Sequence, residues 1–264
     1  MCAERQIDIM AIVNLTDDSF YAASRCDLDS VVARVGRFID EGATIIDFGA
    51  CSTRPGSLPV GEDEEWCRLK PALKAVRKAY PHVAISIDTY WASVVEKAYD
   101  LIGSFIVNDI SAGRMDPLML PAVGRLGLPY IAMHMRGTPY DMQTLCEYDD
   151  VVGEVVEYFR DFEERARVNG LKKWIPDPGF GFAKTIGQNY ELMRGLDRLQ
   201  YPDLLVGVSR KSMIYKVLDI TPEESLPATQ VLHFHALNHG ATILRVHDVA
   251  EAARTVALWR RLKG

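Results

Sequence analysis

The chain has 264 residues, of which 48% are hydrophobic and 25% are charged, and its formal net charge is −6. A chain of this size can bury a full core, and its length suits one large domain or two small ones. The acidic balance and the lack of a basic stripe argue against nucleic acid or a membrane surface as the partner. No apolar run is long enough to span a bilayer, and the first residues lack a signal-peptide pattern.

The cysteine pattern indicates a reducing environment. The five cysteines are odd in number, scattered, and never spaced as CxxC, which gives neither a disulfide framework nor a zinc site. We therefore expect a soluble, cytoplasmic protein. The cysteines are Cys2, Cys26, Cys51, Cys67 and Cys146.

Short apolar runs that end in polar residues recur along the chain. Runs of this length and composition predict strands that are buried on both faces, as in a parallel sheet. In chain order the predicted strands are Ile7–Asn14, Thr44–Gly49, Val83–Asp88, Ser104–Asp109, Tyr130–His134, Trp174–Asp177, Leu204–Ser209 and Ile243–His247.

Helical patterns lie between these runs. The longest has apolar residues at helical spacing along one face. Gly170 and Gly240 follow two of the patterns directly, as glycine does just beyond the end of a helix. The predicted helices are Leu28–Glu41, Asp63–Tyr80, Glu147–Asn169, Tyr190–Leu199, Glu223–Asn238 and Val249–Leu262.

About eight strand–helix alternations within 264 residues predict an α/β fold of the (β/α)₈ TIM-barrel type. No linker or low-complexity tract divides the chain, so we expect a single domain over residues 1–264. A doubly wound open sheet is the competing architecture, but it usually has fewer strands and leaves a clear edge. The barrel is the better interpretation.

In a barrel, the residues at the carboxyl ends of the strands form the catalytic mouth. Basic residues gathered at one rim would suit an anionic ligand. Carboxylates and an amide interleaved with them would suit a flat, donor-rich heterocycle. The basic residues are Arg54, Arg136, Lys184, Arg210, Lys211 and Arg245, and the interleaved residues are Asp88, Asn108 and Asp177.

Taken singly, these residues also have structural interpretations. Asp88 could cap the following helix, and Asp177 could be an ordinary turn residue before Pro178-Gly179. Lys211 could be a solvated loop lysine, and His247 could be incidental beside a capping Asp248. Their placement at matching ends of successive strands favours the functional interpretation.

Two other patterns do not support a ligand site. His235 and His239 lie four residues apart, but no glutamate follows His235 and no third metal ligand is near, so we expect packing or surface histidines. The glycines of Gly179-Phe180-Gly181 lack the GxGxxG spacing of a dinucleotide site.

The tips of the predicted strands together resemble the dihydropteroate synthases, the folate-pathway enzymes that join p-aminobenzoate to a pterin. The similarity extends over nearly the whole chain, and its strength lies in the order of many modest motifs. The motifs are Met10–Phe20, Ser52–Gly56, Ile87–Tyr90, Val107–Ile110, Met133–Pro139, Asp177–Phe182, Ser209–Ser212 and Arg245–Asp248.

This resemblance implies a TIM barrel that condenses p-aminobenzoate with 6-hydroxymethyl-7,8-dihydropterin pyrophosphate, giving 7,8-dihydropteroate and pyrophosphate. It implies an S_N1-like course, in which pyrophosphate leaves before the arylamine attacks, so that catalysis rests on positioning and electrostatics. It also implies Mg²⁺, a homodimer and a sulfonamide target.

The resemblance further implies roles for individual residues. Those expected to hold the pterin are Asp88, Asn108, Asp177 and Lys211; those expected to take pyrophosphate with Mg²⁺ are Asn14, Arg245 and His247. Those expected to border p-aminobenzoate are Thr53, Arg54, Pro55, Phe182 and Ser212. Asp88, Lys211, Asp177 and Arg245 are expected to be catalytic, and Asn14 is the one expected metal ligand, which suits an ion that keeps several waters.

Two alternatives remain open at this stage. A methyltetrahydrofolate-binding methyltransferase of the same superfamily would share the pterin carboxylates and the barrel, but not typically the Ser-Thr-Arg-Pro-Gly and Ser-Arg-Lys-Ser tips. A non-catalytic pterin-binding barrel would be expected to lose the anion-binding residues, yet Asn14, Arg245 and His247 are present.

Overall fold

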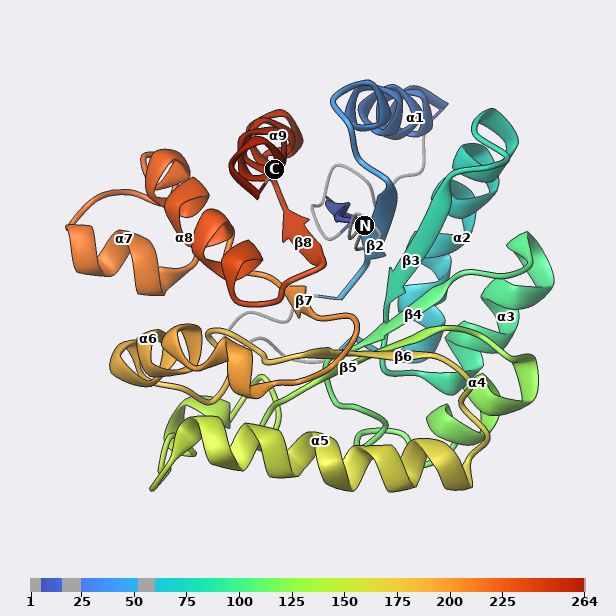
Figure 1. The fold of residues 1–264 in the computed structure, drawn as a ribbon. Helices are drawn as coiled ribbons and strands as arrows, with labels where there is room; N and C mark the ends of the chain where they lie inside the picture. The colour runs from blue at the N-terminus through green and yellow to red at the C-terminus, as the bar shows by residue number, and fades with distance from the viewer. Residues whose placement is uncertain (1–5, 16–24, 52–59, 264) are drawn as a thin grey trace.

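The computed structural model describes residues 6–15, 25–51 and 60–263, without the side chains of 25–27. In this part of the chain eight parallel strands form one sheet in the order β6-β5-β4-β3-β2-β1-β8-β7, and contacts between β6 and β7 close it into a barrel (Figure 1). The predicted TIM-barrel fold is confirmed. The strands are β1 (Asp8–Asn14), β2 (Ile45–Gly49), β3 (Ala84–Asp88), β4 (Ile106–Asp109), β5 (Tyr130–Met133), β6 (Trp174–Asp177), β7 (Leu205–Val206) and β8 (Ile243–Val246).

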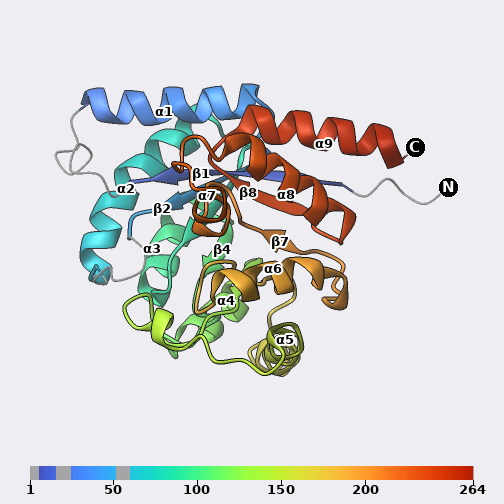
Figure 2. The ribbon, with the colours of Figure 1, turned by 90° about the vertical axis from the view of Figure 1, so that its left-hand side faces the viewer.

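Helices surround the barrel, and two of them, α7 and α8, follow β7 in succession. Figures 1 and 2 show α1 next to α9 on one side of the barrel, with α5 on the opposite side. The helices are α1 (Arg25–Asp40), α2 (Glu62–Ala79), α3 (Ala92–Ile102), α4 (Met119–Leu126), α5 (Val151–Val168), α6 (Ile186–Arg194), α7 (Ser212–Leu218), α8 (Leu226–Asn238) and α9 (Val249–Lys263).

Alternation along the strands separates two apolar layers. Residues on one face of each strand pack against the helices in the main core, while those on the other face point into the barrel. The interior residues form a closed apolar floor near the amino ends of the strands. This floor consists of Met10, Ile45, Ile131, Ile175, Leu205 and Ile243, with the partly buried Ile106 against it. The polar side chains of the candidate site lie at the opposite, carboxyl end.

The predicted strands agree closely with the observed ones, except for the seventh. The sequence predicts a strand over Leu204–Ser209, but β7 pairs with β8 only through Leu205 and Val206. The chain then turns, and Lys211 N donates to Val208 O at 3.1 Å. Val208 lies beyond the paired part of the strand and is buried because it packs in the main core.

Helix starts differ from prediction where a cap decides them. Thr185 and Gln188 form a capping box, so α6 begins four residues before the predicted Tyr190. Asp150 accepts from Gly153 N at 2.9 Å, so α5 begins after it and not at Glu147. The short helices α3, α4 and α7 were not predicted, and α4 ends at Gly127 in a left-handed conformation.

In the described part of the chain, no helix combines the length and apolar character needed to cross a membrane. His235 and His239 lie at the end of α8 and just beyond it, with stacked rings whose centroids are 4.0 Å apart. His239 Nδ1 lies 2.8 Å from the His235 carbonyl oxygen, a local contact typical of packing. The described residues contain no cluster of three or more His, Cys, Asp or Glu side chains able to hold a metal.

Candidate active site

Arg245 organises the carboxyl end of the barrel. It lies in β8, and its guanidinium bridges two carboxylates, donating through Nε to Asp47 Oδ2 at 2.7 Å and through Nη2 to Asp88 Oδ2 at 2.8 Å. Asp47 and Asp88 come from β2 and β3, so three strands meet at one ion-pair network. Two carboxylates beside one guanidinium leave three of its five N–H groups for a ligand.

Burial strengthens this network. The Asp47 side chain is fully buried, and those of Asp88 and Arg245 are only 11% and 21% exposed. Asn108 in β4 donates through Nδ2 to Asp47 Oδ2 at 3.3 Å. Burial would lower the pKa of Arg245, but Asp47 and Asp88 raise it above its ordinary value, so the guanidinium stays charged.

The pKa of Asp88 is raised to about 7. Burial is the main cause, and repulsion from Asp47, Asp109 and Asp177 adds to it, while Arg245 acts in the opposite direction. The alternative interpretation, in which Asp88 only caps the next helix, is wrong. The N-cap residue of α3 is Trp91, and the first N–H of the helix donates to Asp116 Oδ2 at 2.8 Å.

Asp177 and Lys211 form the second part of the mouth. Asp177 ends β6, and its Oδ1 accepts from Gly179 N at 2.8 Å, as expected of a turn residue. Lys211 precedes α7, donates through Nζ to Phe180 O at 2.5 Å, and lies 5.1 Å from the centroid of the Phe182 ring.

Burial lowers the pKa of Lys211 to about 8, although Asp177 opposes this shift. Burial raises the pKa of Asp177, and Lys211 opposes that shift in turn. Lys211 is therefore no solvated loop lysine. Lys211 and Asp177 attract each other electrostatically, and the Phe182 ring lies beside Lys211. Ser212, the first residue of α7, comes directly after Lys211.

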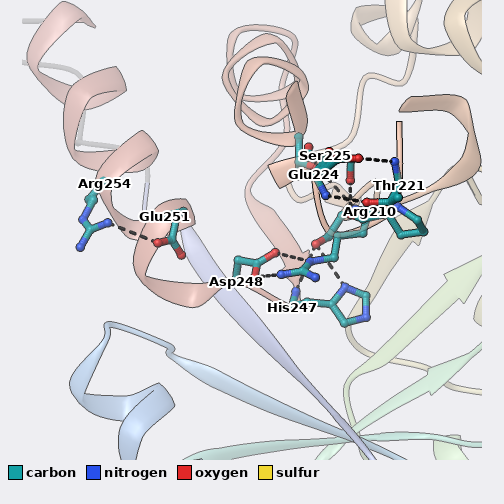
Figure 3. A network of polar contacts seen from close by, with 11 residues as sticks. Arg210, Thr221, Glu224, Ser225, His247, Asp248, Glu251 and Arg254 are labelled. Carbon is teal, nitrogen blue, oxygen red and sulfur yellow. Dashed lines mark hydrogen bonds and ion pairs between the residues drawn. The ribbon is translucent and has the colours of Figure 1, made fainter. Parts of the chain in front are cut away.

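His247 follows β8 at the exposed rim. Its backbone N–H donates to Ser209 Oγ at 3.2 Å, and its ring Nδ1 also lies 3.2 Å from that hydroxyl oxygen. Figure 3 shows Arg210 beside it, reaching to Asp248 with two parallel hydrogen bonds of 2.9 and 2.6 Å. This bidentate pair ties the tip of β7 to that of β8 and fixes His247 between them.

Asn14 ends β1 with an exposed side chain. A Cβ atom added to Gly49 would lie 3.7 Å both from Asn14 Oδ1 and from Asp88 Oδ2, so the two oxygens lie on the same side of that glycine. Asp88 Oδ2 already accepts from Arg245, which leaves Asn14 Oδ1 for a metal. A single protein oxygen suits magnesium, which binds few protein ligands and relies on substrate phosphates. The donor set therefore fits the expected ion.

Three of the basic residues expected at the anion-binding rim do other work. Arg136 pairs with Glu154 and lies over the Tyr148 ring, and Arg210 pairs with Asp248. Lys184 is only 3% exposed. The charges of these three residues are therefore already paired or buried, which argues against their direct contact with an anion.

The structure brings most of the predicted site residues to one end of the barrel. Thr53, Arg54 and Pro55 lie outside the described residues. The residues at the carboxyl ends of the strands or in the turns that follow are Asn14, Asp88, Asn108, Asp177, Phe182, Lys211, Ser212, Arg245 and His247.

Asp47 was missing from the predicted binding residues. Its signal was present in the sequence: it stands between Ile46 and Phe48 in an apolar strand. Because Ile46 and Phe48 pack in the outer core, alternation turns Asp47 inward. A buried carboxylate requires a partner, and only the fold shows that this partner is Arg245.

The chain matches known proteins along most of its length. A family described as "Pterin binding enzyme" matches residues 10–247. Dihydropteroate synthase of Escherichia coli K12 is 39% identical over 94% of this chain and 89% of that protein. The folic acid synthesis protein fol1 of Pneumocystis carinii is also 39% identical, but the chain spans only 36% of its length.

Solved structures agree. Dihydropteroate synthase of Yersinia pestis, in complex with a sulfonamide drug, superposes with a TM-score of 0.90 at 35% identity, covering 98% of this chain and 94% of that one. The Xanthomonas albilineans enzyme with 4-aminobenzoic acid gives 0.89 at 33% identity, with coverage of 98% and 94%. The fold, the mouth and these relatives lead to one conclusion: the chain belongs to the pterin-binding enzyme family and, within it, to the dihydropteroate synthases.

Proposed function

We propose that this chain, as one barrel domain over residues 1–264, condenses p-aminobenzoate with 6-hydroxymethyl-7,8-dihydropterin pyrophosphate in folate biosynthesis. The observation that carries the proposal is the buried network of Arg245 with Asp47 and Asp88, beside Asp177 and Lys211, at the mouth of a barrel of this family. Carboxylates there meet a donor-rich ring, and cations meet an anionic leaving group.

Each group has a defined task in the proposed reaction. Asp177 and Asn108 bind the ring donors of the pterin, with Lys211 at its edge. Thr53, Arg54, Pro55, Phe182 and Ser212 border p-aminobenzoate, as the family resemblance implies. The remaining N–H groups of Arg245, together with His247, bind the pyrophosphate.

The chemical step is proposed to be S_N1-like. The C–O bond to pyrophosphate breaks with its electron pair, and ionised Asp88 stabilises the resulting methylene cation. The lone pair of the arylamine then forms the C–N bond, and the amine proton passes to solvent. No side-chain nucleophile is needed, so positioning and electrostatics account for catalysis.

Magnesium, when bound with the substrate, would neutralise charge on the pyrophosphate. Asn14 is the proposed protein ligand. Such an ion is needed because the ionised groups nearest Arg245 are carboxylates: Asp47, Asp88 and Asp177 against Arg245 and Lys211. With all five groups ionised their net charge is −1, so these groups alone offer no net positive charge to hold a pyrophosphate.

Two broader features belong to the same proposal. We place the protein in the cytoplasm, since its five cysteines are odd in number, scattered and never spaced as CxxC. We place a homodimer interface on α7, α8 and α9, because large apolar side chains are exposed there; sedimentation analysis tests it. These side chains are Val217, Leu218, Val231, Leu258 and Leu262.

The direct test is to incubate the enzyme with pterin pyrophosphate and Mg²⁺, with and without p-aminobenzoate. We expect 7,8-dihydropteroate and pyrophosphate in equal amounts only when p-aminobenzoate is present. Transfer of a methyl group from methyltetrahydrofolate would favour the methyltransferase, and binding without turnover would favour a non-catalytic barrel.

We expect Asp177→Asn to weaken pterin binding about tenfold or more while leaving p-aminobenzoate binding nearly unchanged. Asp177 Oδ1 already accepts from Gly179 N, so an amide would keep that bond and turn its NH₂ group toward the donor-rich ring. Calorimetric titration of each ligand measures the difference. Equal losses for both ligands would show that Asp177 does not bind the pterin.

We expect kcat/KM for the pterin substrate to rise with pH through about 7 and to fall above about 8. The pKa of Asp88 is raised to about 7, so the carboxylate forms above that pH, and the pKa of Lys211 is lowered to about 8, so the ammonium is lost above that one. Rates measured from pH 5.5 to 9.5 test this. A profile that is flat between pH 6 and 9 would contradict it.

The raised pKa of Asp88 affects stability in the opposite direction from activity. Asp88 has an ordinary pKa of 3.8 and a folded pKa of about 7, so the folded state binds more protons than the unfolded state between these values. Its contribution to stability is full below about 4 and is lost as the pH rises through 7. Activity therefore increases over a range in which this residue stabilises the fold less.

A further inference from the structure

Lys184 is a buried lysine that none of the proposed steps uses. Its side chain lies beneath the turn after β6, and the residue is 3% exposed. Nζ donates to the carbonyl oxygens of Gly179 and Phe182, each at 3.0 Å, and lies 2.8 Å from His134 Nδ1. An ammonium has three donors and no acceptor, so His134 accepts through Nδ1 and carries its own proton on Nε2. All three N–H groups of Lys184 are therefore satisfied.

The turn that Lys184 holds has an unusual backbone. Gly179, Gly181 and Ala183 have φ values of 70°, 83° and 48°, all in the left-handed region. A Cβ atom on Gly179 would lie 2.0 Å from the His134 carbonyl oxygen, so the turn is packed closely against the end of β5. A non-glycine residue in this region is strained, and Ala183 keeps its conformation only if neighbouring contacts hold it.

Two lysines donate hydrogen bonds to carbonyl oxygens of this turn. Lys184 binds the carbonyls of Gly179 and Phe182 from within, while Lys211 binds the carbonyl of Phe180 from the mouth at 2.5 Å. Lys211 also lies over the Phe182 ring. The position of this short turn therefore sets where Lys211 and Phe182 stand relative to Asp177.

We infer that Lys184 is a positioning residue for the pterin pocket: it holds the turn Pro178–Ala183 through two hydrogen bonds, ties it to His134 through a third, and so aligns Asp177, Phe182 and Lys211 for the ring. This inference rests on the proposed function, because it assigns the pterin to that part of the mouth. Lys184 itself need not touch the substrate.

The three hydrogen bonds of Lys184 compensate for surroundings that disfavour its ammonium. Burial lowers the pKa of Lys184 to about 7, Asp177 opposes the shift, and Lys211 and Arg136 add to it. Cys146 raises the pKa, and burial keeps the pKa of His134 well below its ordinary value, so that ring stays a neutral acceptor. A buried charge is unfavourable unless its hydrogen bonds are complete, and here they are.

The test compares Lys184→Met with Lys173→Met, its matched control at an exposed lysine before β6. The probes are 6-hydroxymethyl-7,8-dihydropterin, which lacks pyrophosphate, and inorganic pyrophosphate with Mg²⁺, each titrated calorimetrically. We expect Lys184→Met to raise the Kd for the pterin at least tenfold and to change that for pyrophosphate less than twofold. Lys173→Met should change neither.

Unchanged pterin affinity in Lys184→Met would overturn the inference, as would equal weakening of both ligands, which indicates general damage. His134→Phe keeps a ring beside Tyr158 and removes one acceptor, so it decides the question if Lys184→Met does not fold. A rise of about threefold in the Kd of His134→Phe for the pterin, with the Kd for pyrophosphate unchanged, supports the inference. An unchanged Kd for the pterin overturns it. Wild-type turnover is measured separately, and its absence would refute the proposed function without altering these binding results.

Discussion

Replacing Lys211 with alanine is expected to lower kcat/KM for the pterin substrate by about 10- to 150-fold, the equivalent of about 1.5–3 kcal/mol for a lost hydrogen bond to a charged group. The ammonium is partly buried between the Phe180 carbonyl and the Phe182 ring and faces Asp177. The substitution removes the cation at the edge of the pterin. It also removes one of the two lysines that donate hydrogen bonds to the turn after β6.

The fold should survive this substitution. Lys211 lies outside the strands and before α7, and its removal opens no cavity in the apolar floor or the outer core. Lys216→Ala, at an exposed position of α7, is the matched control and should retain full activity. Steady-state kinetics on both variants, with thermal unfolding to confirm folding, provide the measurement. Near-wild-type kcat/KM in Lys211→Ala would remove this residue from the site.

Much of the site could be predicted because strand ends are a local property of the sequence. Asp88, Asp177 and Asn14 each end an apolar run, and a parallel barrel gathers such ends at one rim. Apart from the seventh strand, the strand limits were also predictable, since each run is buried on both faces. The resemblance to a known family then added roles that patterns alone do not provide.

Pairing could not be predicted in the same way. Arg245 meets Asp47 and Asp88 only because closure of the barrel brings β8 close to β2 and β3, which lie far away in sequence. Arg136 and Arg210 looked like free cations because Glu154 and Asp248 give no local sign of being their partners. Charge at a strand end is visible in sequence, whereas neutralisation by a distant residue requires the fold.

Replacing Arg245 with methionine is expected to destabilise the protein by about 3–5 kcal/mol, the typical effect of leaving a buried ion pair without one partner. Asp47 is fully buried and Asp88 nearly so, and the two would then repel each other without a cation between them. Asn108 donates to Asp47 only through two long contacts of 3.3 and 3.4 Å and cannot replace the guanidinium. Activity should be lost as well, because Asp88 would no longer be held in place.

A double variant separates charge from packing. Adding Asp47→Asn to Arg245→Met removes the more deeply buried carboxylate, so it should recover part of the lost stability, although Asp47→Asn alone should be destabilising. Arg254→Met is the control, since its pair with Glu251 on α9 is exposed and its loss should change stability by no more than about 0.5 kcal/mol. Urea unfolding of the wild type, the two single variants and the double variant gives the coupling free energy between positions 47 and 245. If the destabilisations of the two single variants simply add, Arg245 does not act by neutralising Asp47, and the buried network is not what holds the mouth together.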